Sequence, residues 1–119
     1  MSVVDKNTPH FPLKISLTEM NERTRALIEY YIERSNNRVF CLADNADATE
    51  VILADFDHPG AASRLPALAS RSDCALIVLA VGERKIDGAI VVRKPLDSSG
   101  LEQAASEALA LLTERWQNS

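Results

Sequence analysis

The stretch VILADFDHPG, residues 51–60, decides the fold class, because an unbroken apolar run ends abruptly in two carboxylates and a Pro-Gly turn. Continuous apolar runs recur at 75–81 and 89–92. Strands of this kind are normally covered on both faces, which is typical of the parallel sheets of α/β proteins. We therefore expect strands at 13–17, 39–42, 51–56, 75–81 and 89–92.

Helical patterns separate or follow these runs. Residues 19–34 repeat apolar side chains at helical spacing after Thr18, which is a favoured capping residue. A capping-box pattern at 99–102 opens the longest helical pattern, which continues to Trp116. Residues 61–71 favour a helix that is short or starts late, because Pro66 disfavours helical backbone at the residue before it.

Two connections are too short for a full crossover helix. They comprise residues 43–50 and 82–88, whereas a parallel crossover with its helix needs at least about 10–12 residues. We expect at most one helical turn in each, and a β-hairpin between the last two strands stays open. A sheet face without its helices would expose apolar side chains and form an interface. We expect these to be Leu76, Val78, Ile90 and Val92.

Length, charge and cysteine content restrict the class of protein. The 119 residues suit one domain, which we place at 13–116, between a flexible tail at 1–12 and a tail or linker start at 117–119. The net charge is −4 and the basic residues are scattered, so no nucleic-acid or membrane surface is expected. The longest apolar run, 74–81, is too short to span a membrane. Two cysteines and no targeting signal indicate the cytoplasm.

Several common active sites are absent from the sequence. The four glycines form neither a dinucleotide-binding turn nor a phosphate-binding loop. The cysteines and histidines lack zinc-site spacing, and no nucleophile elbow occurs. Cys41 and Cys74 lie in or beside strands and are expected to be small buried hydrophobes. We do not expect an enzyme.

Charged residues nevertheless converge at one edge of the predicted sheet. Asp55 ends one strand, Glu19 follows the first strand, and Lys94 follows the last. In an open α/β sheet, ligands bind outside the carboxyl ends of the strands. Two carboxylates suit Mg²⁺, and an ammonium can neutralise a phosphoryl group. Equally, Asp55 and Lys94 can form a structural ion pair, and Glu19 can favour the positive end of a helix.

The strand-Asp-x-x-x-Pro-Gly segment at 51–60 and the strand-Lys-Pro segment at 89–95 resemble the receiver domains of two-component response regulators, over about residues 13–116. The resemblance implies a flavodoxin-like α/β fold with a five-stranded parallel sheet of order 2-1-3-4-5. It implies that Asp55 accepts a phosphoryl group from a histidine kinase and that Lys94 contacts the phosphoryl oxygens. It further implies a Mg²⁺ site made by Glu19, Asp55 and the backbone carbonyl of Asp57.

The chain departs from the receiver pattern at three further positions. Met20 stands in place of the second acidic residue, Ala80 in place of a hydroxyl residue, and Val91 in place of the switch aromatic. The two short connections correspond to the second and fourth helices of the family, which are shortened or missing here. The sequence therefore resembles a degenerate receiver, or pseudo-receiver.

These observations favour a signalling module that acts through protein contacts, as a homodimer or docked to a partner or output domain, without ordinary phosphorylation. Two alternatives stay open. One is a working phosphoacceptor receiver with Mg²⁺ as its only cofactor, and the other is an α/β domain that binds a small ligand.

Overall fold

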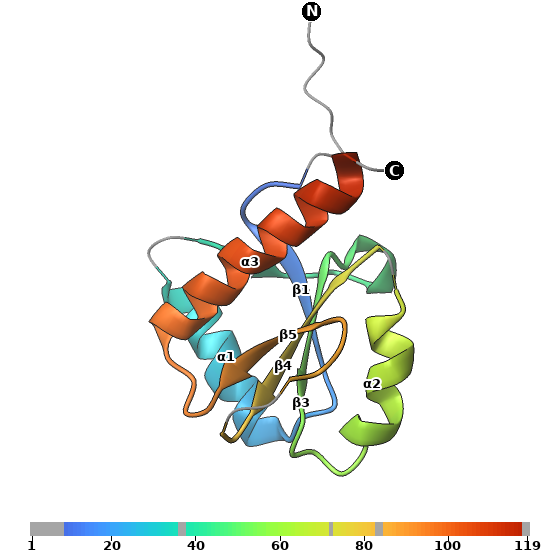
Figure 1. Ribbon diagram of the computed structural model, residues 1–119. Coiled ribbons are helices and arrows are strands. Elements are labelled where there is room, and N and C mark those ends of the chain that lie inside the picture. The colour runs from blue at the N-terminus through green and yellow to red at the C-terminus, as the bar shows by residue number, and fades with distance from the viewer. Residues whose placement is uncertain (1–8, 36–37, 72, 83–84, 118–119) are drawn as a thin grey trace, which may run out of the picture.

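The structure, a computed structural model, describes residues 9–35, 38–71, 73–82 and 85–117. Its centre is a five-stranded sheet in which every pairing is parallel and the order is β2-β1-β3-β4-β5 (Figure 1). The flavodoxin-like α/β fold is therefore confirmed, and β4 and β5 are not a hairpin. The strands are β1 (Leu13–Thr18), β2 (Phe40–Leu42), β3 (Val51–Asp55), β4 (Ala75–Ala80) and β5 (Ala89–Arg93).

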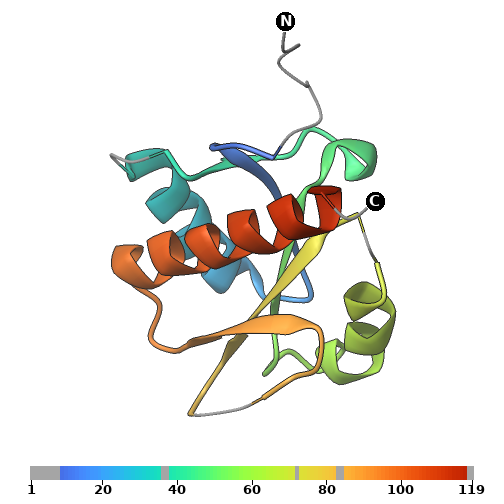
Figure 2. The same cartoon turned by 45° about the horizontal axis from the view of Figure 1, so that its top comes forward.

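In the part of the chain that the structure describes, three helices cover the two faces of the sheet. The helices are α1 (Glu22–Arg34), α2 (Ala61–Ala69) and α3 (Ser98–Gln117), with a single 3₁₀ turn, η1 (Ala46–Ala48). Helices α1 and α3 pack on one face, where they bury the larger core, and α2 packs on the other (Figure 2). None of the helices in the described part of the chain is long and apolar enough to cross a membrane.

The helix starts differ from the sequence-based expectation because other residues cap them. The side chain of Asn21, not Thr18, accepts a hydrogen bond from the backbone N–H of Thr24, so α1 begins at Glu22. The carboxylate of Asp97 likewise accepts from Gly100 N at 2.7 Å, and α3 begins at Ser98. Helix α2 is short, as expected, but it does not start late. It contains Pro66, whose missing N–H removes one hydrogen bond within the helix.

The two short connections hold little helix, as predicted. Residues 43–50 contain only η1, and the described residues between β4 and β5 contain no helix. Strand β1 shows why no helix is needed near β2. Its residues alternate between buried apolar and more exposed polar, so Lys14, Ser16 and Thr18 face the α2 side, where α2 packs on β3 and β4. The hydroxyls of Ser16 and Thr49 also hydrogen-bond to each other there.

The expectation of an exposed apolar sheet face is wrong. Leu76 and Val78 are fully buried on the α2 side, where Ile86 packs in the place of a helix. Ile90 and Val92 point to the opposite face and pack against the α1/α3 core. The reason is the register, because β5 is paired so that Ile90 lies opposite Ile77 rather than Leu76.

The two cysteines differ in burial. Cys74 is buried as expected, and its thiol contacts the carbonyl of Thr49 at 3.3 Å. Cys41 is only half-buried, contrary to expectation, because it lies on the uncovered side of β2. The expected flexible tail at 1–12 falls mainly outside the described residues, which begin at 9, and residues 118–119 also lie outside them.

Candidate functional site

Three charged side chains meet at the carboxyl-terminal edge of the sheet. The Lys94 ammonium donates to Asp55 Oδ1 at 2.7 Å and to Asp57 Oδ2 at 3.0 Å. The exposed fractions of the three side chains are 6% for Asp55, 26% for Lys94 and 45% for Asp57. The pair between Lys94 and Asp55 is therefore largely shielded from solvent, whereas Asp57 sits at the rim. We call these three residues the charged triad.

Lys94 reaches Asp55 across the end of an intervening strand. Asp55 ends β3 and Lys94 follows β5, and β4 lies between them. Neighbouring strands are about 4.8 Å apart, so the two side chains and the hydrogen bond between them together bridge roughly two strand spacings. The backbone N–H of Lys94 donates to the carbonyl of Ala80 at 2.9 Å, which fixes its starting point. Ala80 itself is fully buried.

Local backbone geometry fixes the Asp55 carboxylate. Its Oδ1 accepts a second hydrogen bond from the N–H of Asp57 at 3.0 Å, which closes a tight turn after β3. The backbone carbonyl of Asp55 accepts a hydrogen bond from the N–H of His58 at 3.1 Å. The backbone N–H of Asp55 donates to the carbonyl of Glu19 at 3.2 Å. Asp55 Oδ1 therefore accepts two hydrogen bonds, one from the Lys94 ammonium and one from the N–H of Asp57 in the turn.

The triad also perturbs the lysine. Burial acts to lower the pKa of Lys94, but hydrogen bonds to Asp55 and Asp57 outweigh it and raise the pKa above its ordinary value of 10.5. Lys94 is therefore a permanent cation at neutral pH, held between two carboxylates.

Glu19 does not join the triad through its side chain. Its carboxylate lies 3.5 Å from His58 Nδ1 and 3.5 Å from an Arg64 nitrogen. Its φ angle is +51°, in the left-handed region that few residues with side chains adopt. Gly60 permits this placement, because a Cβ there would lie 2.6 Å from Glu19 Oε2. Glu19 is thus directed to the first turns of α2.

The Mg²⁺ site that the resemblance implies stays a prediction. Within the described residues, no three aspartate, glutamate, histidine or cysteine side chains lie close enough together to hold a metal ion. The Asp57 carboxylate, which the sequence did not implicate, faces Lys94 instead. Sequence reasoning also missed His58 and Arg64 as partners of Glu19. No sequence pattern marks them, because the contact depends on the backbone angle of Glu19.

The three positions that depart from the receiver pattern are occupied by packed side chains. Met20 is buried in the α1/α3 core. Ala80 is buried at the end of β4. Val91 is half-buried and lies opposite Val78, which is on the α2 face of the sheet. None of the three presents a polar group to the triad.

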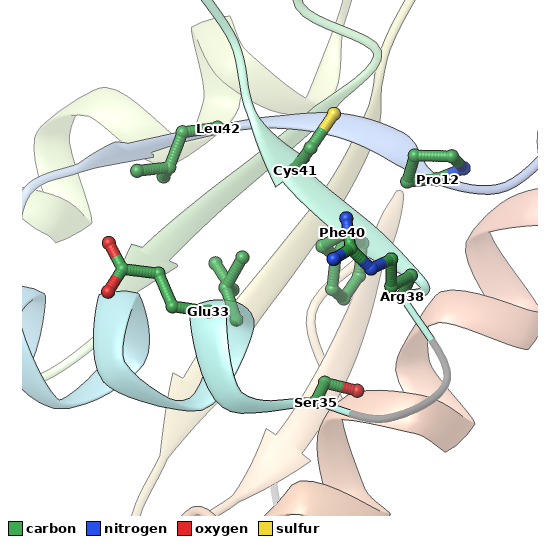
Figure 3. A pocket seen from close by; sticks show the side chains of 8 residues that line it. Pro12, Glu33, Ser35, Arg38, Phe40, Cys41 and Leu42 are labelled. Carbon is green, nitrogen blue, oxygen red and sulfur yellow. The ribbon is translucent and has the colours of Figure 1, made fainter.

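The surface of the described residues also has hollows away from the triad. One of about 600 Å³ runs between α2 and residues 86–88 and is mainly apolar. Another, of about 310 Å³, follows the outer side of β2 and is lined by both polar and apolar residues (Figure 3).

The chain matches no protein-family model, no curated protein and no solved structure. A functional conclusion therefore rests on the geometry described above.

Proposed function

We propose that the chain is a receiver-like signalling domain that acts through contacts with proteins, and that its aspartate is held in an ion pair instead of passing through a phosphorylation cycle. The observation that carries the proposal is the charged triad. Lys94 and Asp55 occupy the strand ends that the receiver resemblance implies, 2.7 Å apart. Lys94 is also bound by Asp57, and Glu19 is bound elsewhere.

Charge balance supports the absence of an ordinary cycle. Phosphorylation of a carboxylate places a group of about −2 charge where −1 stood before. Enzymes that move phosphoryl groups neutralise this charge with a metal ion as well as a lysine or arginine. Here Lys94 already compensates two carboxylates, and the Glu19 carboxylate lies 3.5 Å from an Arg64 nitrogen. A second acidic residue and a hydroxyl are replaced by Met20 and Ala80.

The proposed setting follows from the same features. The thiols of Cys41 and Cys74 are free, which fits a reducing cytoplasm. The partner would be a protein, either a second copy or a docked domain. No chemical step is assigned to the domain, and no cofactor is required for it.

A working phosphoacceptor is the second candidate. The observation in its favour is that Lys94 already points at Asp55, as a residue that stabilises a phosphoryl group would. In this case Mg²⁺ would have to draw Glu19 away from α2. A domain that binds a small ligand is the third candidate, supported by the apolar hollow beside α2.

The test is an amide NMR spectrum recorded with Mg²⁺ and then with beryllofluoride, which mimics a phosphoryl group on an aspartate. We expect no saturable shift at residues 19, 55 and 94. The Asp55→Asn variant is the control, since it removes the acceptor carboxylate. Saturable shifts in the wild type that vanish in the variant would overturn the proposal in favour of a working receiver.

A further inference from the structure

One edge of the sheet has backbone groups that point outward. Strand β2 is the first strand in the sheet order, and within the described residues it pairs with β1 alone. The carbonyl of Val39 and the N–H of Ala43 both bond to β1, at 2.9 Å each. Alternate residues of a parallel strand face the same neighbour. The backbone groups of Phe40 and Leu42 therefore face away from β1, toward the open edge.

The segment along this edge is complementary to a second, antiparallel copy of itself. The segment RVFCLAD, residues 38–44, has a cysteine at its centre, an apolar residue on each side of it, and opposite charges at its two ends. Arg38 and Asp44 are both exposed. The side chain of Leu42 is 41% exposed, which is unusual for a large apolar residue in a strand.

We infer that the partner of this domain is a second copy of the same chain, whose β2 pairs antiparallel with β2 of the first about a two-fold axis at Cys41. The inference rests on the proposed function, because it names the partner and the surface of an interaction module. The two sheets would join into one continuous sheet of ten strands.

The outward backbone groups are compatible with this register. In an antiparallel pair, residues directly opposite exchange both hydrogen bonds only if both face the partner. A two-fold axis at Cys41 places Phe40 opposite the second copy's Leu42, and Leu42 opposite the second copy's Phe40. Both of these pairs then exchange backbone hydrogen bonds. A shift by one residue would place outward backbone groups opposite inward ones, and the hydrogen bonds between the two strands would be lost.

The same register pairs the charges. Arg38 comes opposite the second copy's Asp44, and the pair occurs twice because the axis is two-fold. Figure 3 shows Glu33 of α1 at the Leu42 end of the hollow along β2 and Arg38 at the Phe40 end. The axis therefore also brings the second copy's Arg38 toward the end that carries Glu33. Opposite charges at both ends favour this orientation over a parallel one, in which each end would face its own sign.

Cys41 provides a direct test of the register. At the axis it lies opposite its own copy at a position without backbone hydrogen bonds, where Cα atoms are about 4.5 Å apart. This separation permits a disulfide. In a Cys74→Ala variant, Cys41 is the one remaining thiol. Treatment with diamide, which is reduced as it oxidises two thiols, should convert the chain to a covalent dimer, and Cys41→Ser should not be converted.

Association is measured by sedimentation equilibrium. A strand pair of this length is small beside a standard interface of about 1,600 Å². We therefore expect a reversible dimer with a dissociation constant of roughly tens to hundreds of micromolar. Leu42→Lys should weaken it at least about tenfold, since the change occurs twice in the interface. Leu27→Lys is the matched control, because Leu27 is 45% exposed on α1, and it should leave the dimer unchanged.

A charge exchange separates this geometry from other dimers. Arg38→Asp alone and Asp44→Arg alone each place like charges opposite one another twice, so each variant should be monomeric. An equimolar mixture of the two restores both opposite-charge pairs and should dimerise as the wild type does. The double variant R38D/D44R should also recover.

Three results would overturn the inference. One is a monomer at all concentrations. Another is a dimer that Val91→Lys on the opposite edge strand disrupts and Leu42→Lys does not. The third is a mixture of the charge variants that stays monomeric. In the last two cases the proposed function stands, because the beryllofluoride titration tests it without reference to β2.

Discussion

Lys94 Nζ lies 2.7 Å from Asp55 Oδ1, and this contact joins the ends of two strands that are not neighbours in the sheet. Asp55 ends β3 and Lys94 follows β5, so the contact bridges the end of β4, which lies between them in the sheet. The pair is largely buried, and the rim carboxylate of Asp57 completes it. A buried carboxylate that accepts both a lysine and a backbone N–H has little freedom to exchange these partners for another ligand.

The two aspartates of the triad should contribute unequally to stability. Asp55→Asn should lower the free energy of unfolding by about 1–2 kcal/mol, because it weakens two hydrogen bonds to a shielded carboxylate. Asp57→Asn is the matched control and should cost less than about 1 kcal/mol, since its pair with Lys94 is close to solvent. Urea denaturation of both variants measures the difference. Equal losses of unfolding free energy in the two variants would show that the burial of Asp55 does not strengthen its contribution to stability.

The stabilisation by Lys94 should disappear at high pH. The pKa of Lys94 is raised in the folded chain, because its hydrogen bonds to Asp55 and Asp57 outweigh the effect of burial. The stabilisation is therefore complete below the ordinary value of 10.5 and is lost as the pH rises through the higher folded value. The difference in unfolding free energy between wild type and Lys94→Met should be constant from pH 7 to about 10 and then shrink.

Lys85→Met is the control for this titration, since Lys85 is exposed and belongs to no salt bridge among the described residues. It should show little difference from wild type at any of these pH values. A Lys94 difference that grows as the pH rises would contradict the assigned direction of the shift.

Gly60 and Glu19 should be energetically coupled. A Cβ at Gly60 would meet Glu19 Oε2 at 2.6 Å, so Gly60→Ala should cost up to about 1 kcal/mol by displacing a flexible carboxylate. In a Glu19→Ala background the same change should instead stabilise by about 0.4–1 kcal/mol, because the backbone angles of Gly60 suit alanine. A double-mutant cycle measures this coupling. An unchanged effect of Gly60→Ala in the two backgrounds would contradict the position assigned to Glu19.

The two thiols should react at different rates. Cys74 is buried, and burial raises the pKa of its thiol, whereas Cys41 is half-exposed on β2. A colourimetric thiol reagent should modify Cys41 at least about tenfold faster than Cys74 in the native chain. The Cys41→Ser and Cys74→Ala variants assign the two phases, and urea should abolish the difference. Similar native rates would contradict the burial of Cys74.

Much of the fold follows from the sequence. The unbroken apolar strands at 51–56, 75–81 and 89–92 predicted a parallel sheet, and the short connections correctly predicted missing helices. Which face each side chain takes did not follow, because it depends on register. Ile90 lies on the α3 side since it pairs with Ile77, and no local pattern in an all-apolar strand fixes that pairing.

The site was predicted in part for a similar reason. Asp55 and Lys94 meet because parallel topology brings the ends of their strands to one edge, which the sequence reveals. Glu19 is at the same edge, but its side chain turns to His58 and Arg64. That direction is set by a left-handed backbone angle at Glu19 and by the absence of a Cβ at Gly60. Both are three-dimensional facts with no signature in the spacing of residues.

The proposed function makes protein contact independent of phosphorylation, and one measurement tests this most directly. Sedimentation equilibrium of the wild type is compared with and without Mg²⁺ and beryllofluoride, and with Asp55→Asn. We predict the same association constant in all three conditions. Association that appears or strengthens only when beryllofluoride is present, and that Asp55→Asn abolishes, would contradict the account and identify a working phosphorylation switch.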